Sequence, residues 1–323
     1  MSLARSLPRA RAAGAPAAPA APARAAAPAW KVWTCMWIVY VVWGSTYLAI
    51  RIMVETVPPL LGAGVRFALA GVVLLVLVAA FRGAAAIRPT RAQLRGALLV
   101  GTLLCGANAV VTVAEVDVPS ALAALLIAAV PLIVILLRRA TGDEIARSSV
   151  VGVAVGFTGV AILLLPGDRP DGASLIGMLG VLAAAVMWAT GSFASPRTAL
   201  PRDPFASTGW QMLLGGGISA LAGVALGEIA DVDFGAFSTD SVLAFAYLVV
   251  FGSLVAFSAY IWLLQNVPVS KVSTYAYVNP VIAIFLGWMI LDETITTTTL
   301  IGATVIVASV WVVVRVESRR RAA

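Results

Sequence analysis

A chain of 323 residues that is 61% hydrophobic and only 11% charged cannot fold as a water-soluble globule, because soluble domains carry about 25% charged residues. Its net charge of +7 does not indicate nucleic-acid binding, which needs basic residues gathered on a polar surface. The absence of histidine excludes a Ser-His-Asp triad and a histidine metal site, and neither Lys31 nor Lys271 follows the glycines of a Walker A loop. We therefore expect an integral membrane protein without ATPase activity.

The first 30 residues differ from the rest of the chain, because they are almost entirely alanine, proline and arginine. Such a segment buries too little apolar surface to offset the conformational entropy lost on ordering. It also lacks the continuous apolar region of a signal peptide. We predict a disordered tail over residues 1–30, which its arginines place on the cytoplasmic side of a membrane.

Ten apolar segments follow this tail, with short breaks between them. A helix needs about 20 apolar residues to cross the hydrocarbon core of a bilayer. Short connections make consecutive helices antiparallel neighbours. The sequence thus predicts an all-α integral membrane protein with ten transmembrane helices. The centres of the ten segments lie near Trp43, Gly71, Cys105, Ala128, Phe157, Ala184, Gly216, Val250, Val281 and Ala308.

Basic and acidic residues alternate between the connections. Arginines occur in the connections at 82–95 and 138–147, whereas acidic residues occur at 115–117 and 228–240. Cytoplasmic loops of membrane proteins carry an excess of lysine and arginine. We therefore expect both termini, including a basic tail at 318–323, on the cytoplasmic side of a cell (inner or plasma) membrane.

Two distant stretches share one pattern. Residues 130–144 read VPLIVILLRRATGDE and residues 279–293 read NPVIAIFLGWMILDE, and in each the proline precedes the glutamate by 13 positions. The second stretch lacks the arginine pair Arg138 and Arg139. This difference is expected if the same helix end faces the cytoplasm in the first copy and the outside in the second.

The same duplication relates Trp43 and Arg66 to Trp188 and Gln211, since each pair is separated by 23 positions. Each unit contains five segments, and because five is odd, the second unit must insert in the opposite sense. Inverted repeats with a site at their interface are an architecture of secondary transporters. The two five-helix units comprise residues 32–165 and 173–317.

Ionisable and helix-bending residues inside these segments are the first functional candidates. Arg66 lies within the second segment, where a charge costs about 2.5–3.5 kcal/mol. Its guanidinium either extends to the outer interface or faces a cavity, paired with Glu115 or with an anionic group of a substrate. Pro131 and Pro280 are predicted to bend the fourth and ninth helices, because proline removes one backbone hydrogen bond.

Helical spacing places further aromatic and polar side chains on shared faces. Trp43 and Tyr47 are four positions apart, and so are Tyr275 and Asn279. Polar faces rarely contact lipid, so they indicate either a water-filled cavity or hydrogen bonding between helices. The candidate cavity residues are Trp43, Tyr47, Arg66, Asn108, Glu115, Trp188, Gln211, Tyr260, Tyr275 and Asn279.

Several stretches of the chain resemble the drug/metabolite transporter superfamily, in the branch of exporters built from EamA repeats. The resemblance extends over about residues 32–317 and implies two inverted five-helix repeats. It also implies a central cavity lined by helices 1–4 and 6–9, with helices 5 and 10 at the periphery. Gln211 departs from the repeat symmetry, because the first repeat has Arg66 at that place. The matching stretches are WGSTYLAIR (43–51), GVRFALAG (64–71), VPSALAALLIAAVPL (118–132), WQMLLGGG (210–217) and FGSLVAFSAYIWLLQNVPVSKVSTYAYVNPVIAIFLGWMILDE (251–293).

Members of this superfamily export amino acids and other small metabolites. The resemblance therefore implies a secondary-active or facilitative transporter that exports small metabolites, amino acids or drug-like molecules by alternating access, without naming the cargo. An importer or exchanger is the alternative within the transporter class, and a non-transporting scaffold is the alternative outside it. An enzyme is not expected, since no clustered nucleophile, base or metal ligands are present. The expected partners are a small-molecule substrate and the lipid bilayer, with a second copy in a homodimer as a further candidate; no cofactor, metal or nucleic acid is expected.

Overall fold

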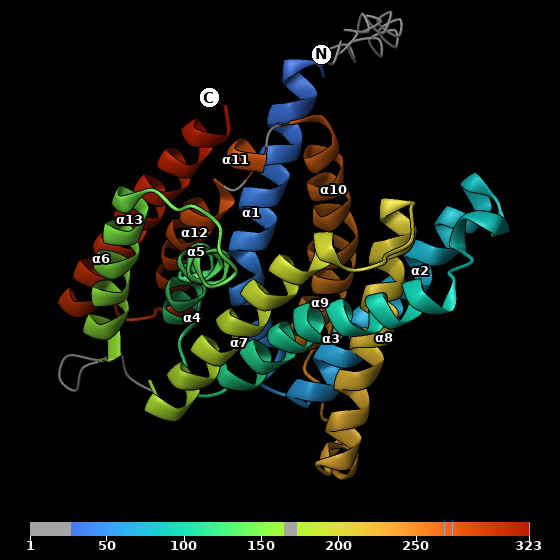
Figure 1. Ribbon diagram of the computed structural model, residues 1–323. Coiled ribbons are helices and arrows are strands. Elements are labelled where there is room, and N and C mark those ends of the chain that lie inside the picture. Colours follow the sequence, from blue (N-terminus) through green and yellow to red (C-terminus); the bar gives the residue numbers. More distant parts are fainter. Residues whose placement is uncertain (1–26, 165–172, 268, 273, 323) are drawn as a thin grey trace, which may run out of the picture.

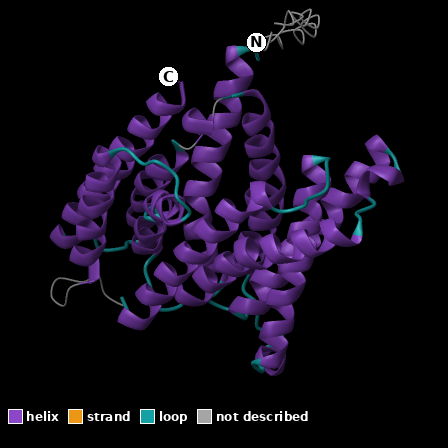
Figure 2. Cartoon of the chain, viewed as in Figure 1, coloured by secondary structure: helices purple, strands orange, loops and turns teal. Residues whose placement is uncertain are grey.

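A computed structural model describes residues 27–164, 173–267, 269–272 and 274–322 (Figure 1). Within these ranges the chain forms helices joined by loops, and no strand (Figure 2). The expected all-α class is thus confirmed for this part of the chain. Of the expected disordered tail, residues 1–26 lie outside the described ranges, and the first helix starts at Ala29.

In the first half of the chain, local signals explain where helices begin. Pro59 occupies the first turn of α2, where its missing N–H costs no hydrogen bond. Thr90 and Gln93 form a capping box at the start of α3, in which each side chain accepts from the other residue's backbone N–H. The helices are α1 (Ala29–Met53), α2 (Pro59–Arg82), α3 (Arg91–Ala114), α4 (Ser120–Ile127), α5 (Val130–Ala140) and α6 (Arg147–Leu164).

The second half contains a π-helical segment, Leu248–Val255, between α9 and α10. Asp203 caps α8, because its Oδ1 accepts from the backbone N–H of Phe205 and Ala206. The last helix continues to Ala322, so the predicted basic tail prolongs this helix through that residue. The helices are α7 (Leu175–Ala194), α8 (Pro204–Ala225), α9 (Thr239–Tyr247), α10 (Ala256–Asn266), α11 (Val269–Val272), α12 (Tyr275–Leu291) and α13 (Thr297–Ala322).

Eight helical stretches among the described residues are long and apolar enough to cross a membrane. The stretch Ser120–Ala140 combines α4 with α5, and Thr239–Leu264 combines α9, the π-helical segment and α10. Helix α12 has 17 residues, or about 26 Å at 1.5 Å per residue, and α8 mixes apolar residues with Gly, Ser, Thr and Gln. The protein is therefore a multi-pass membrane protein, and the expected count of ten spans depends on α8 and α12.

Helices α2 and α8 pack against each other through glycines. A Cβ atom at Gly71 would lie 2.5 Å from the backbone N of Leu213, and a Cβ atom at Gly216 would lie 2.5 Å from the backbone N of Ala68. Residues later in α2 thus contact residues earlier in α8, so the two helices run antiparallel. Since each is the second long helix of its half, the two halves have opposite senses at this interface.

Helices α6 and α13 repeat this arrangement at one edge of the molecule (Figure 1). A Cβ atom at Gly152 would lie 2.7 Å from a methyl carbon of Val313, and one at Gly159 would lie 2.9 Å from Ile306. The pairing is again antiparallel, and it joins the last helix of each half. The glycines of α6 therefore serve close helix packing, as in other small-residue interfaces of membrane helices.

The two prolines that were expected to bend helices have different surroundings. Pro131 follows an interruption at 128–129, where α4 ends and α5 begins, as the missing N–H predicts. Pro280 lies inside α12, which has no break at that position. In this part of the chain the interruption lies earlier, between Val272 and Tyr275, where α11 ends and α12 begins.

Candidate transport cavity

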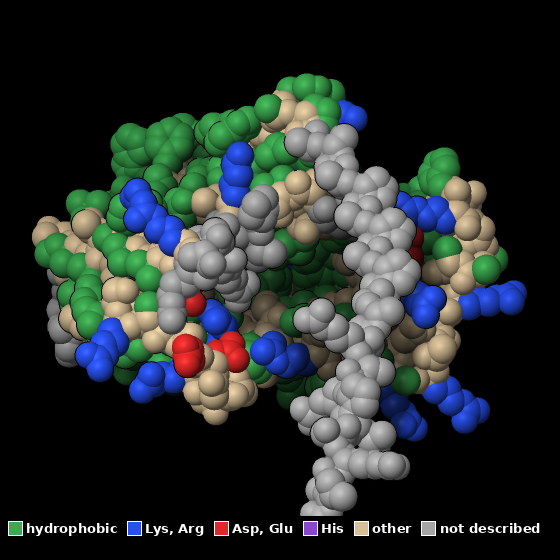
Figure 3. All heavy atoms as spheres, turned by 45° about the horizontal axis from the view of Figure 1, so that its top comes forward, with side chains coloured by type: hydrophobic (Ala, Val, Ile, Leu, Met, Phe, Trp, Pro, Cys, Tyr) green, Lys and Arg blue, Asp and Glu red, His purple; other side chains and the backbone are tan. Residues whose placement is uncertain are grey.

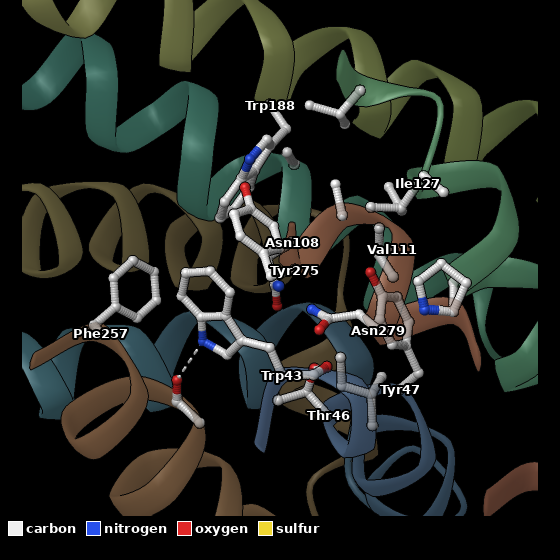
Figure 4. Close-up of a pocket in the computed structure, with 18 of the residues that line it drawn as sticks. Trp43, Thr46, Tyr47, Asn108, Val111, Ile127, Trp188, Phe257, Tyr275 and Asn279 are labelled. Atoms are coloured by element: carbon white, nitrogen blue, oxygen red, sulfur yellow. Dashed lines mark hydrogen bonds between the residues drawn. The ribbon is translucent and has the colours of Figure 1, made fainter. Parts of the chain in front are cut away.

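Helices from both halves of the chain surround a cavity of about 110 Å³ (Figure 4). A single water needs about 10–15 Å³ on this scale, so the cavity has room for several waters or a small organic molecule. Its wall comes from α1–α5 in the first half, and from α7, the π-helical segment, α10 and α12 in the second. The cavity is therefore an interface between the two halves.

One side of the cavity is aromatic and centred on Trp43. Its ring lies 5.1 Å from the ring of Phe257 and 5.2 Å from that of Tyr275, in edge-to-face geometry. The indole Nε1 donates to the backbone O of Gly252 at 3.3 Å, in the π-helical segment (Figure 4). These contacts fix the indole ring, and the cavity gains a rigid apolar surface for a planar group.

Polar side chains from three helices also line the cavity. Asn108 of α3, Asn279 of α12 and Thr46 of α1 line the cavity, and Figure 4 shows the two amides and the ring of Trp43 converging on one space. The Oδ1 atom of Asn279 is buried and has no hydrogen-bond partner among the described residues. The cavity thus combines an aromatic surface with amide groups that can orient a ligand.

Arg66 of α2 lines this cavity and is only 3% exposed. Its Nη2 donates to Oδ1 of Asn108 at 2.7 Å, and its guanidinium lies 4.1 Å from the ring centre of Phe67. Its Nε and Nη1 atoms are buried and have no acceptor among the described residues. Of the two alternatives for Arg66, the structure therefore has the guanidinium facing the cavity and not extending to the membrane interface.

At the end of the molecule away from the termini, Arg51 and Glu293 make contacts between helices. The Nη1 of Arg51 donates to the backbone oxygens of Glu115 and Val116, which follow α3. The carboxylate of Glu293, which follows α12, accepts from the backbone N–H of Ser120 at 2.7 Å and of Ala121 at 3.1 Å. Arginine at a helix C-terminus and carboxylate at a helix N-terminus both complement the helix dipole.

Glu228 makes an analogous contact with α2. Its carboxylate accepts from the backbone N–H of Leu60 at 3.0 Å and of Leu61 at 2.8 Å. Glu228 follows α8, so a carboxylate from the second half caps a helix of the first half here too. Glu228 and Glu293 thus bridge the two halves at the same end of the molecule, which we call the bridged end.

Glu115 is completely buried beyond α3 and lies outside the cavity lining. Neither carboxylate oxygen has a hydrogen-bond partner among the described residues. Burial, reinforced by the charge of Glu293, raises the pKa of the Glu115 carboxyl well above its ordinary value, although Arg51 and Arg66 oppose the shift. Burial therefore favours the neutral form of this carboxyl.

The face that carries the two termini differs from the opposite end. Figure 3 shows lysine and arginine side chains around a hollow on this face, and hydrophobic side chains at the bottom of the hollow. Helix ends on this side carry basic residues in their last turns, including Arg82 of α2 and Arg138 and Arg139 of α5. Basic side chains therefore gather on the face that carries the termini.

Comparison with known proteins decides the family. The EamA-like transporter family matches residues 31–165 and residues 175–315, which together cover both halves of the chain. The chain belongs to this family. The expected membership of the EamA-repeat branch is therefore confirmed.

Relatives of this EamA-like transporter have transport functions in their names. The inner membrane transporter YedA of Escherichia coli (strain K12) is 38% identical over 278 residues, which cover 85% of this chain and 87% of the relative. A probable amino-acid metabolite efflux pump of Escherichia coli (strain K12) is 24% identical over 85% of this chain and 92% of the relative. A crystal structure that is 21% identical covers 91% of this chain and 99% of its own, with a TM-score of 0.62, which indicates a shared fold.

Most of the residues singled out from the sequence of this EamA-like transporter line the cavity. Their helical spacing identified the inward faces of α1 and α12, because residues three or four positions apart share one face. Both prolines, which were expected to bend helices, are also part of the wall. The residues from those predictions that line the cavity are Trp43, Tyr47, Arg66, Asn108, Pro131, Trp188, Tyr275, Asn279 and Pro280.

Three predicted cavity residues lie elsewhere. Glu115 lies beyond the end of α3, nearer the bridged end. Gln211 lies in α8. The Nε2 atom of Gln211 donates to Oγ of Ser207, one turn earlier in the same helix, at 2.9 Å. Tyr260 lies behind the wall, where its ring is 5.0 Å from the ring of Trp43. The implied contribution of the seventh long helix, α8, to the cavity lining is absent among the described residues.

The sequence analysis did not identify several lining residues. Thr46 and Ile50 lie three and seven positions after Trp43, so the same helical face would have included them. Gly252 and Phe257 lie in and just after the π-helical segment, whose period differs from that of an α-helix. No α-helical spacing rule would have found this second pair.

Proposed function

We propose that this EamA-like transporter exports small metabolites from the cytoplasm by alternating access to the cavity at its centre. The observation that supports this proposal is that both halves of the chain contribute to one cavity with an aromatic wall and buried polar groups. Substrate sites of secondary transporters lie at the interface of inverted repeats. The name of the 24% identical relative, a probable amino-acid metabolite efflux pump, favours export as the direction.

The proposal includes ten membrane crossings, with both termini in the cytoplasm. In this arrangement α8 and α12 join the eight apolar stretches as the seventh and ninth crossings. The basic side chains on the face of the termini favour this orientation, because cytoplasmic surfaces of membrane proteins are rich in lysine and arginine. The antiparallel pairs α2–α8 and α6–α13 favour opposite insertion of the two repeats.

In this orientation the structure corresponds to a state closed toward the outside. Arg51, Glu228 and Glu293 make hydrogen bonds that hold helices together at the outer end. Opening toward the outside would separate α12 from α4 and break the contact between Glu293 and Ser120. Transport then consists of rocking between two sets of helix contacts around one cavity.

The cavity favours facilitated or exchange transport over proton coupling inside it. None of the described residues that line it is Asp, Glu or His, so no lining side chain can take up and release a proton near neutral pH. Glu115 is a buried carboxyl outside this lining. We therefore propose that substrate gradients drive the flux.

The test is transport by the purified protein in proteoliposomes. Cells that overproduce the chain are first screened for increased tolerance of amino acids and their metabolites, and each compound that scores is then used as a radiolabelled probe. We expect saturable efflux of at least one probe and counterflow when unlabelled probe is present on the opposite side. Protein-free liposomes are the control.

Two outcomes would contradict this proposal. Absence of saturable flux for every compound, with the protein monodisperse and folded, would favour the non-transporting scaffold. Greater accumulation of the probe in overproducing cells than in control cells would favour an importer.

A further inference from the structure

Arg66 is the starting point, because it carries the only formal charge among the described residues that line the cavity. It is 3% exposed and forms no ion pair with a described residue. A buried cation without a counter-charge is costly in a low-dielectric site. The cavity is therefore electrostatically incomplete when it holds water alone.

The hydrogen bonds of the guanidinium are also incomplete. Asn108 accepts from Nη2, and the ring of Phe67 covers one face of the group. The Nε and Nη1 atoms are buried without acceptors. These contacts hold the guanidinium in place while two of its nitrogens remain available, which is the arrangement of a preformed anion site.

A carboxylate of the protein does not fill this place. Glu115 interacts electrostatically with Arg66, but its oxygens are buried without hydrogen-bond partners and no ion pair joins the two side chains. The carboxylate of Glu293 already accepts two backbone N–H groups of α4. Neither carboxylate therefore supplies the missing acceptors of Arg66.

The rest of the cavity defines the rest of the occupant. The rings of Trp43, Phe257 and Tyr275 provide an apolar surface within the same cavity. We propose that the cavity binds organic monoanions, with the carboxylate on Arg66 and a planar apolar body against the ring of Trp43. This inference names the substrate class of the proposed transport function and rests on it, but the site can be tested by binding alone.

The test compares two probes that differ in charge and little in shape, phenylacetate and phenylacetamide. Binding of radiolabelled phenylacetate to the purified protein in lipid nanodiscs would be measured by a scintillation proximity assay. Each unlabelled compound would then be added as a competitor. We expect phenylacetamide to bind about 10- to 100-fold more weakly, since it lacks the charged acceptor for Arg66.

Variants assign this preference to one side chain. Arg66→Gln should weaken phenylacetate binding by about the same factor and abolish the preference, because it removes the buried charge. Arg66→Lys should retain the preference, since it retains the charge. Arg197→Gln is the matched control, because Arg197 is exposed and donates to the backbone O of Phe193, near the end of α7.

Equal affinity of the wild-type protein for the two probes, or binding of neither, would overturn the inference. A preserved preference in folded Arg66→Gln would also overturn it. If Arg66→Gln does not fold, the inference is tested by the preference for phenylacetate over phenylacetamide in the wild-type protein and in Arg66→Lys. A carboxylate preference without flux in proteoliposomes would contradict the transport proposal and leave the site intact, whereas flux without this preference would contradict the site alone.

Discussion

Two buried ionisable side chains near the cavity differ in the way their charge is accommodated. Arg66 retains its charge with an amide and an aromatic ring as neighbours. Glu115 has no hydrogen-bond partner for its carboxyl among the described residues, and burial favours its neutral form. The wall therefore presents one positive charge to the cavity, while burial favours the neutral form of the Glu115 carboxyl outside the lining.

The raised pKa of Glu115 predicts how stability changes with pH. Above its ordinary pKa of 4.5 the unfolded chain loses this proton while the folded protein keeps it. The free energy of unfolding should therefore fall as pH rises from about 4.5 through the raised pKa of the folded protein, and level off above it. Glu115→Gln lacks this proton and should show a flatter dependence of its thermal midpoint on pH.

The control for this measurement is Glu55→Gln, at the same end of the molecule but at an exposed position. It should follow the wild-type curve. A Glu115→Gln curve parallel to that of the wild type would contradict the neutral carboxyl. Because Glu115 lies outside the cavity lining, we also expect the Glu115→Gln variant to retain transport.

At the scale of helices, close approach of backbones holds the two halves together. The neighbouring glycines Gly216 and Gly217 allow a direct test. A Cβ atom at Gly216 would lie 2.5 Å from the backbone N of Ala68, whereas a Cβ atom at Gly217 would meet nothing within 4 Å. Gly216→Ala should therefore destabilise the fold by about 1–3 kcal/mol, because backbone must move to admit the methyl group.

Gly217→Ala is the matched control for this prediction. It adds the same methyl group one position further along α8 and should raise stability by up to about 1 kcal/mol through helix propensity. Thermal unfolding in detergent compares the two variants. Equal effects of the two substitutions would mean that α2 and α8 are less closely packed than the glycine contacts imply.

Helix positions could largely be predicted from the sequence, and helix interruptions could not. Apolar length alone placed the long helices, and Pro131 indicated the break between α4 and α5. The π-helical segment Leu248–Val255 has no such signal, because its hydrogen-bond register depends on neighbouring helices. Pro280 predicted a bend in the ninth helix, and α12 continues through this position without a break, since surrounding helices can compensate for one lost hydrogen bond.

At the same level, the inward faces of α1 and α12 could be predicted, because Trp43 and Tyr275 belong to periodic aromatic and polar patterns. The location of Gln211 could not. Repeat symmetry placed it at the position equivalent to Arg66, but the backbone of Gln211 packs against Gly101 of α3 and its side chain donates to Ser207 of α8. Symmetry of sequence predicts the place of a helix better than the orientation of one side chain.

For the whole molecule, the central claim is that one cavity between two oppositely oriented repeats opens to each side of the membrane in turn. Ala276 lines this cavity, and a cysteine there would leave Arg66 and both asparagines unchanged. Ala184, which is fully buried in helix packing, provides a control position. Both cysteines would be introduced into a chain in which Cys35 and Cys105 are replaced by serine.

The decisive measurement is labelling of Ala276→Cys by a membrane-impermeant anionic methanethiosulfonate reagent, applied separately to inside-out and right-side-out vesicles. Alternating access predicts labelling from both sides, loss of flux after labelling, and no labelling of Ala184→Cys. Failure of Ala276→Cys to be labelled from either one of the two sides would contradict alternating access. Undiminished flux after complete labelling of Ala276→Cys would also contradict it.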